Sequence, residues 1–248
     1  MEAGFQPTRQ PERIGRMHFE ADQDRIEEEE VHMSIAELTP VRPAHRTALR
    51  LHAGSNGTLM AIDEFETIEP DDCDQRFRYE LINGVVVVSP PPGDGEIDSN
   101  DELGRLLRNY QETPQGKVLD KTLFEREVKT RVGIRRVDRA LWIGFGRPIK
   151  SRRDRATILV EFVSPGKRAA LRDYEEKRDE YLEMGAKEYW IIDRFRRTMT
   201  VYFQKPATPA ERVVTESETY STPLLPGFEL PLRRLLELAD QYADDEST

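Results

Sequence analysis

Two carboxylates stand where they could build a site for phosphate chemistry. Glu161 is the only charge in the apolar, β-branched run 156–163, where a carboxylate is costly unless it is paired or binds a metal. Asp138 follows a basic hairpin at the start of another predicted strand. Two carboxylates on neighbouring strands suit Mg²⁺, which takes one or two of them and keeps waters for exchange with phosphate oxygens. Asp138 and Glu161 are therefore our candidate metal ligands. The alternative is that Glu161 lies at an edge of the sheet or is paired with a nearby arginine.

Lys177 lies four residues after Asp173 on the helix predicted to follow the Glu161 strand. From there its ammonium group could reach the end of that strand, where it would favour hydroxide and stabilise negative charge on phosphate. The alternative is an exposed ion pair between Asp173 and Lys177. Glu80 is interpreted either as a further ligand or support of the site, or as a member of an ordinary salt bridge.

The elements predicted around these residues mix strands and helices. The Asn83-Gly84 pair between apolar runs 77–81 and 85–88 predicts a hairpin, because Asn-Gly supplies the positive φ of a type I′ turn. An apolar stripe with helical spacing predicts a helix around residues 103–110. Further helices are expected at 62–68, 171–184 and 231–239, and strands at 117–122, 124–132, 137–145, 156–163, 189–192 and 198–203.

The formal net charge of −10 is unevenly distributed along the chain. Residues 1–57 carry −3, residues 206–248 carry −6, and the segment between them carries −1. Within that segment, residues 117–155 hold 13 basic and 5 acidic side chains and surround Asp138. This local excess predicts a basic groove for phosphates, with a solvated charged face as the alternative. Nucleic-acid contacts are expected at Arg131, Arg135, Arg136 and Arg139.

Composition excludes several other kinds of site. All four histidines precede residue 58, which weighs against His-based nucleases, Ser-His-Asp hydrolases and His-ligated zinc in the core. Cys73 is the only cysteine, so an internal disulfide framework is excluded. No apolar run is long enough to cross a membrane. We expect a reduced, cytoplasmic protein without membrane contact.

Three regions are expected from these patterns. Residues 1–57 are poor in apolar residues, contain scattered prolines and hold an acidic block at 27–30, so they are expected to form a poorly ordered acidic extension. Residues 58–238 are expected to form the folded domain. Residues 239–248 are expected to form a disordered acidic tail.

An ordered set of motifs lies between about residues 59 and 236. The motifs are Tyr79-Glu80-Leu81-Ile82-Asn83-Gly84, Ser89-Pro90-Pro91-Pro92, Val137-Asp138, Val160-Glu161-Phe162-Val163-Ser164-Pro165, Asp173 with Lys177 and Tyr181, Glu188-Tyr189-Trp190-Ile191-Ile192-Asp193, and Pro223-Leu224-Leu225-Pro226-Gly227-Phe228-Glu229-Leu230. This set resembles the Uma2 family, whose members are restriction-endonuclease-like proteins of the PD-(D/E)xK nuclease superfamily. The resemblance implies a mixed α/β fold, with an N-terminal hairpin and a central mixed β-sheet flanked by helices. It also implies a site for Mg²⁺ or Mn²⁺.

The resemblance assigns roles residue by residue. Asp138 matches the metal-binding aspartate of the family and Glu161 the acidic residue of the next strand. Val163 stands where the superfamily pattern has a lysine, and Lys177 matches the lysine that similar proteins carry on the following helix. Glu80 matches the glutamate of the Tyr-Glu-Leu motif.

Two positions depart from the family pattern. Val137 replaces the proline that usually precedes the aspartate, which is a mild change because only the backbone direction is concerned. Glu96 lies near the place of a histidine that often follows the Pro-Pro-Pro segment. If that histidine assists the site, Glu96 changes the local charge and weakens the approach of a phosphate.

We therefore expect a metal-dependent endonuclease that hydrolyses phosphodiester bonds of DNA, with Asp138, Glu161 and Lys177 as catalytic residues. Glu80 and Asp173 are expected to support them. One alternative is a catalytically inactive nuclease fold that binds nucleic acid or acts as an interaction module. Another is an interaction protein whose acidic extension binds a basic partner. A homodimer is compatible with the resemblance.

Overall fold

The computed structural model describes residues 50–242 of the chain. Most of the predicted extension and tail, residues 1–49 and 243–248, lies outside the described residues. The folded part begins earlier than predicted, because Leu51 is buried in a small core cluster and a 3₁₀ turn spans Ala53–Ser55. It also ends later than predicted, because helix α5 (Leu232–Asp240) continues beyond residue 238 and buries Ala239.

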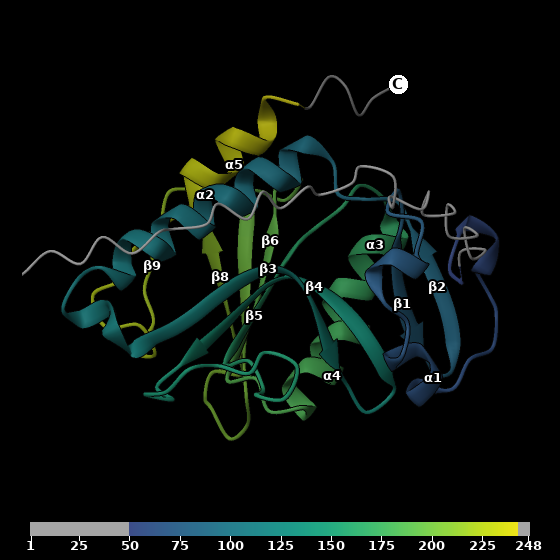
Figure 1. Ribbon diagram of the computed structural model, residues 1–248. Coiled ribbons are helices and arrows are strands. Elements are labelled where there is room, and N and C mark those ends of the chain that lie inside the picture. The colour runs from purple at the N-terminus through teal and green to yellow at the C-terminus, as the bar shows by residue number, and fades with distance from the viewer. Residues whose placement is uncertain (1–49, 243–248) are drawn as a thin grey trace, which may run out of the picture. The chain divides into compact units, whose positions relative to one another are not determined.

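An eight-stranded sheet organises the described part of the chain (Figure 1). Its order is β2-β1-β4-β5-β6-β7-β8, with β3 paired to β4 outside this path. Only the β5–β6 pair is parallel, so the expected mixed sheet is confirmed. The strands are β1 (Arg78–Ile82), β2 (Val85–Ser89), β3 (Leu119–Lys129), β4 (Gly133–Ile143), β5 (Ile158–Phe162), β6 (Glu188–Asp193), β7 (Thr198–Phe203) and β8 (Glu211–Thr215), and a separate pair is β9 (Thr219–Tyr220) with β10 (Leu230–Pro231).

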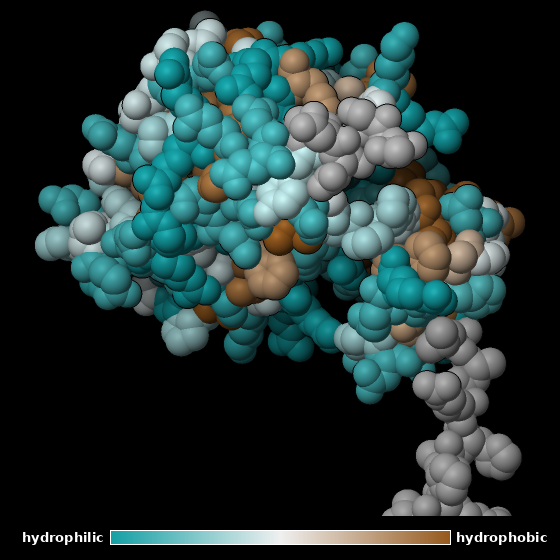
Figure 2. Space-filling view, turned by 90° about the horizontal axis from the view of Figure 1, so that it is seen from above, coloured by the Kyte–Doolittle hydropathy of each residue, from teal (hydrophilic) through white to brown (hydrophobic). Residues whose placement is uncertain are grey.

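Helices flank the sheet. α2 (Asp94–Gln111) and α5 lie side by side (Figure 1), and the Ser99 hydroxyl donates to the Leu235 carbonyl at 2.7 Å. Seen from this side, the surface is mostly hydrophilic, with apolar residues scattered over it (Figure 2). No helix described between residues 50 and 242 is long and apolar enough to span a bilayer. The remaining helical segments are α1 (Ile62–Glu66), 3₁₀ turns at Pro70–Asp72 and Gln115–Val118, and the run α3 (Lys167–Leu171), π-helix (Arg172–Lys177) and α4 (Arg178–Glu183).

Alternation along the central strands separates two apolar cores. Ile158, Val160 and Phe162 of β5 pack in the cluster that includes the apolar faces of α2 and α5. Leu159 packs in a second cluster with Tyr181 of α4. Because neighbouring strand residues face opposite sides of a sheet, Glu161 shares the α4 side with Leu159. The strand thereby turns one carboxylate toward the helix that carries Lys177.

The sequence predicts the β1–β2 hairpin better than the β3–β4 hairpin. Asn83 and Gly84 have φ of 51° and 77°, which confirms the type I′ turn between β1 and β2. The expected separate strands 117–122 and 124–132 form one strand, β3. Its pairing with β4 continues past Glu125, although that residue adopts a positive φ of 49°.

The sheet divides along one edge of β4. On the edge opposite β3, β1 pairs with Gly133 and Ile134, whereas β5 pairs with residues 139–141. Between these two ladders, residues 135–138 have no strand partner on that edge. The gap between β1 and β5 leaves room for side chains, and the candidate site lies there.

Candidate active site

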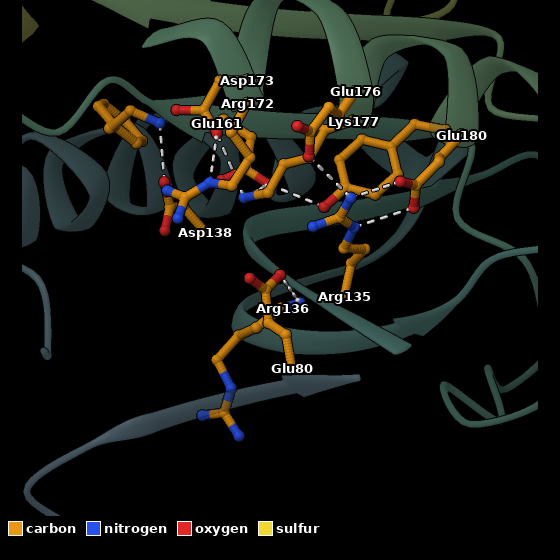
Figure 3. A network of polar contacts seen from close by, with 12 residues as sticks. Glu80, Arg135, Arg136, Asp138, Glu161, Arg172, Asp173, Glu176, Lys177 and Glu180 are labelled. Carbon is orange, nitrogen blue, oxygen red and sulfur yellow. Dashed lines mark hydrogen bonds and ion pairs between the residues drawn. The ribbon is translucent and has the colours of Figure 1, made fainter. Parts of the chain in front are cut away.

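The three predicted catalytic side chains converge at the gap between β1 and β5 (Figure 3). The Lys177 ammonium lies 2.9 Å from Glu161 Oε1, and Asp138 Oδ2 accepts the backbone N–H of Phe162 at 2.8 Å. All three residues are buried. Together with Glu80 they line a cavity of about 20 Å³. Such a space holds a single ion or water beside the two carboxylates.

A π-helical segment directs Lys177 and Asp173 inward. The sequence predicts one continuous helix over 171–184, but residues 172–177 form a π-helix, a rare geometry often found at functional sites. Asp173 Oδ1 lies 3.4 Å from the Lys177 ammonium, and their side chains are 1% and 3% exposed. The alternative of a solvent-exposed pair is therefore wrong. Both side chains belong to the buried network.

Two tyrosines and an arginine hold the network in place. The Tyr181 hydroxyl donates to Glu161 Oε1 at 2.9 Å, and the Tyr189 hydroxyl donates to the backbone carbonyl of Asp173 at 3.0 Å. Arg172 Nε lies 3.4 Å from Asp173 Oδ1. Because hydrogen bonds fix the carboxylates from several sides, the site is preorganised.

Glu80 supports the backbone of the gap. Its Oε1 accepts the N–H of Arg136 at 2.9 Å and so occupies the place of a missing strand partner. Burial alone would raise the pKa of Glu80, but the charge of Lys177 and the Arg136 N–H outweigh it and lower that pKa. Glu80 therefore remains a buried, ionised carboxylate beside the backbone of β4.

The charged groups of the network shift one another's pKa values. Burial opposes the charge on Lys177, but Glu161 and Asp173 outweigh it and raise the lysine pKa. Burial raises the pKa of Glu161 well above its ordinary value despite Lys177, and Asp138 and Asp173 add to that rise. Burial likewise raises the pKa of Asp173, with Lys177 and Arg172 opposing it. Lys177 is thus a permanent cation among carboxylates that repel one another.

Sequence reasoning missed Arg78, whose Nη1 lies 3.5 Å from Asp138 Oδ1. Arg78 also pairs with Glu125 of β3. Its signal in the sequence is alternation, because Arg78 and Glu80 stand two residues apart on β1 and share one face. Tyr181 was noted only as part of a motif, and its hydroxyl contact to Glu161 depends on the tertiary structure.

Glu96 places another carboxyl group near the site. It lies in the first turn of α2 and is buried. Burial, reinforced by the charge of Asp138, raises the pKa of Glu96 to about 7. Where the family pattern has a histidine, this chain therefore has a carboxylic acid whose pKa is raised in part by the charge of Asp138.

The donor set fits a divalent cation of the Mg²⁺ type. Residues 50–242 contain no group of three or more His, Cys, Asp or Glu side chains that could hold a metal ion, and the two predicted ligands, Asp138 and Glu161, both line the site cavity. That number suits Mg²⁺, which fills its remaining positions with water and phosphate oxygens. Burial raises the pKa of Glu161, and the charges of Asp138 and Asp173 add to that rise, so a bound cation would favour the ionised form of this carboxyl group.

The predicted nucleic-acid contacts require a correction at two arginines. Arg135 is 1% exposed and donates to Glu180 of α4 at 2.9 Å. Arg139 is 4% exposed and donates to Asn100 Oδ1 at 2.6 Å and to Thr122 Oγ1 at 3.1 Å. Because both guanidinium groups point into the protein and have partners there, neither can contact a phosphate.

The other two predicted arginines lie at the surface. Arg131 is 75% exposed in its side chain and lies 3.1 Å from Glu183. Arg136 is 29% exposed, lines the site cavity and lies 3.1 Å from Glu127. Both side chains remain open to solvent.

Comparisons with known proteins agree with this geometry. The sequence model of the Uma2 family, described as "Putative restriction endonuclease", matches residues 62–233. Among solved structures, the chain is similar to a crystal structure titled as a putative nuclease belonging to DUF820, from Anabaena variabilis. The TM-score is 0.58 at 15% sequence identity, over 73% of this chain and 99% of that one. No curated protein matches. The expected fold is therefore confirmed.

Proposed function

Because the chain belongs to the Uma2 family, described as putative restriction endonucleases, we propose that it is a metal-dependent endonuclease that hydrolyses phosphodiester bonds of DNA. The observation that carries this proposal is the contact between Lys177 and Glu161 in the same small cavity as Asp138. Three groups suited to phosphoryl chemistry meet there, although Asp138 comes from β4, Glu161 from β5 and Lys177 from the π-helix.

Asp138 and Glu161 are the residues that would hold Mg²⁺ or Mn²⁺. When bound, the cation supplies Lewis-acid stabilisation of charge on the phosphate. Lys177 keeps its proton and so acts as a donor: it orients the attacking water and stabilises negative charge developing on phosphate oxygens. Asp173 and Tyr181 position Lys177 and Glu161, and Glu80 holds the backbone of β4 beside them.

A basic surface groove supports contact with the DNA backbone. Lys129, Arg131, Arg152, Arg153 and Arg155 line a groove of about 550 Å³ together with three acidic residues. Phosphate contacts from such side chains give affinity and orientation without reading sequence. We assign backbone binding to this groove, and to Arg131 and Arg136 among the four arginines first considered.

A nicking assay tests the function. Full-length protein with Mg²⁺ or Mn²⁺ is expected to convert supercoiled plasmid or single-stranded DNA to cut products, and a chelator is expected to stop the reaction. Asp138→Ala removes a metal ligand and is expected to lower the cleavage rate at least about 100-fold. Arg233→Ala, an exposed change on α5, is the matched control. Wild-type inactivity with both metals and both substrates would contradict the proposal.

A non-cleaving nucleic-acid-binding module is the second candidate function. Arg78 favours it, because a guanidinium 3.5 Å from Asp138 competes with a metal ion for that carboxylate. Glu96 lies near the same group, and above a pH of about 7 it adds negative charge that opposes the approach of a phosphate. For this candidate, binding is expected to fall steeply with salt and to survive Glu161→Ala, without nicking.

A further inference from the structure

A second cavity lies beside the candidate active site, and no part of the proposed chemistry uses it. Its volume is about 350 Å³, within the roughly 300–1,000 Å³ range of small-ligand pockets. It lies between α1, β1 and the β3–β4 hairpin. Phe65, Phe77 and Tyr79 supply aromatic walls, and Ile134 supplies an aliphatic one.

The rim of this cavity is basic. Arg126, Lys129, Arg136 and Arg152 line it, against two acids, Glu66 and Glu127. Lys129 is paired with Glu66 and Arg136 with Glu127.

Two of these arginines are unpaired within the described part of the chain. Arg126 has a buried Nε without a hydrogen-bond partner there. Arg152 is exposed, and no described residue pairs with it. Two guanidinium groups are thus available at the rim for an anionic ligand.

The cavity and the candidate active site follow one another along β4. Ile134, Arg136 and Asp138 alternate onto the same face of that strand. Ile134 lines the aromatic cavity, Arg136 lines both spaces, and Asp138 lines the site. Four residues of strand span about 13 Å. A ligand in the cavity is therefore close to a phosphate held at Asp138.

We propose that the aromatic cavity binds one unstacked nucleotide of the strand whose phosphate lies at the Asp138–Glu161 site, so that single-stranded or unpaired DNA is the preferred substrate. This inference rests on the proposed function. Aromatic walls stack on a base of any sequence, and the free arginines bind the adjoining phosphates. A base inside an intact duplex would have to leave its stack and its partner to enter, which costs free energy.

Cys73 makes the cavity measurable without cleavage. It is the only cysteine of the chain, is half-buried and lines the cavity. Full-length protein is treated with iodoacetamide at mildly alkaline pH, with Ca²⁺ in place of Mg²⁺, alone, with a single-stranded oligonucleotide or with its blunt duplex. At a single-strand concentration about ten times its dissociation constant, alkylation is expected to slow about tenfold, because about a tenth of the cavities stay open. The duplex is expected to protect much less.

Variants test the two parts of the cavity separately. Phe77→Ala is expected to weaken single-strand binding roughly tenfold through lost stacking, whereas Phe195→Ala, an exposed phenylalanine that does not line the cavity, leaves it unchanged. Arg152→Ala is expected to reduce the slope of log K against log salt by about 0.7, the value for one phosphate contact on a single strand. Arg233→Ala leaves the slope unchanged. Circular dichroism of each variant separates lost binding from lost folding.

Equal protection of Cys73 by duplex and single strand, or protection by neither, overturns the proposal, whether or not Mg²⁺ supports cleavage of the same oligonucleotides. Protection by the single strand alone supports it. If that protection occurs without any cleavage in Mg²⁺ or Mn²⁺, the cavity assignment stands and the nuclease function fails.

Discussion

The site depends on a lysine whose charge is fixed by its neighbours. Lys177 is 3% exposed, and its ammonium lies between Glu161 and Asp173. A buried lysine without partners tends to lose its proton, but here the carboxylates raise its pKa. The residue is therefore suited to donating hydrogen bonds and stabilising charge, and unsuited to acting as a general base. This distinction follows from geometry that the sequence alone does not contain.

Glu96 predicts a pH dependence of stability. In the folded protein it keeps its proton up to a pH of about 7, against an ordinary value of 4.5. Between these pH values the folded state binds a proton that the unfolded state has lost, so the free energy of unfolding falls as pH rises. Glu96→Gln removes this loss. The variant is expected to match the wild type near pH 4.5 and to be more stable by up to about 3 kcal/mol above pH 7.

Urea unfolding of the metal-free protein at several pH values measures this difference. Glu237→Gln, at an exposed position of α5, is the matched control. A constant stability difference between Glu96→Gln and wild type across the pH range would show that Glu96 does not carry the effect.

Among the elements, strand β4 contributes side chains both to the candidate site and to the packing against α4. Its residues 135–138 border the gap between β1 and β5, and alternation sends Arg135 to α4 while Arg136 and Asp138 face the cavities. Thr130, which follows β3, also donates to Glu180 at 2.9 Å. The β3–β4 hairpin is thus tied to the helix that follows the π-helical segment with Lys177.

Arg135→Met tests this tie. The change leaves Glu180, which is 11% exposed, without its buried partner and is expected to lower the free energy of unfolding by roughly 3–5 kcal/mol. The double variant Arg135→Met with Glu180→Gln is expected to recover part of that loss, because no unpaired charge remains. Denaturant unfolding measures both variants. An Arg135→Met protein of unchanged stability but reduced salt dependence of DNA binding would instead restore the arginine to the nucleic-acid surface.

Local patterns predicted most elements correctly, whereas contacts between elements decided the rest. The Asn83-Gly84 turn and the apolar stripe of α2 depend on neighbouring residues, so the sequence is sufficient for them. The π-helical segment and the gap beside β4 depend on tertiary packing. Arg139 shows why the charge run misled: a Cβ at Gly104 would lie 2.6 Å from its Nη2, so a glycine within α2 makes room for the buried guanidinium. That mid-helix glycine was the available signal.

The predicted site residues came from their residue types on the predicted elements and from the order of the motifs. Asp138, Glu161 and Lys177 are far apart in the sequence, and their spacing alone allows several arrangements. The structure brings them together. It also places Arg78 next to Asp138, although no motif includes Arg78. Which oxygen each donor reaches could not be predicted, because it depends on rotamers fixed by packing.

In the molecule as a whole, whose net charge is −10, the basic residues fall into two groups, one buried and one at the surface. Within the basic segment 117–155, Arg135 and Arg139 stabilise the core. Arg131, Arg152, Arg153 and Arg155 line a surface groove. Phosphate binding is therefore expected to be local and modest in affinity, since few contacts must overcome the repulsion of an acidic chain.

Asp138, Glu161 and Lys177 are proposed to act together as one hydrolytic unit. Single-turnover cleavage of single-stranded DNA in Mg²⁺ tests it, with wild type, Asp138→Asn, Lys177→Met and the double variant, each first shown to be folded. Each single change is expected to slow cleavage at least about 100-fold, and the double variant to be about as slow as the slower single one, because residues that act as a unit are not additive. An inactive wild type would exclude the proposed hydrolysis, and losses that multiply in the double variant would show that Asp138 and Lys177 act independently.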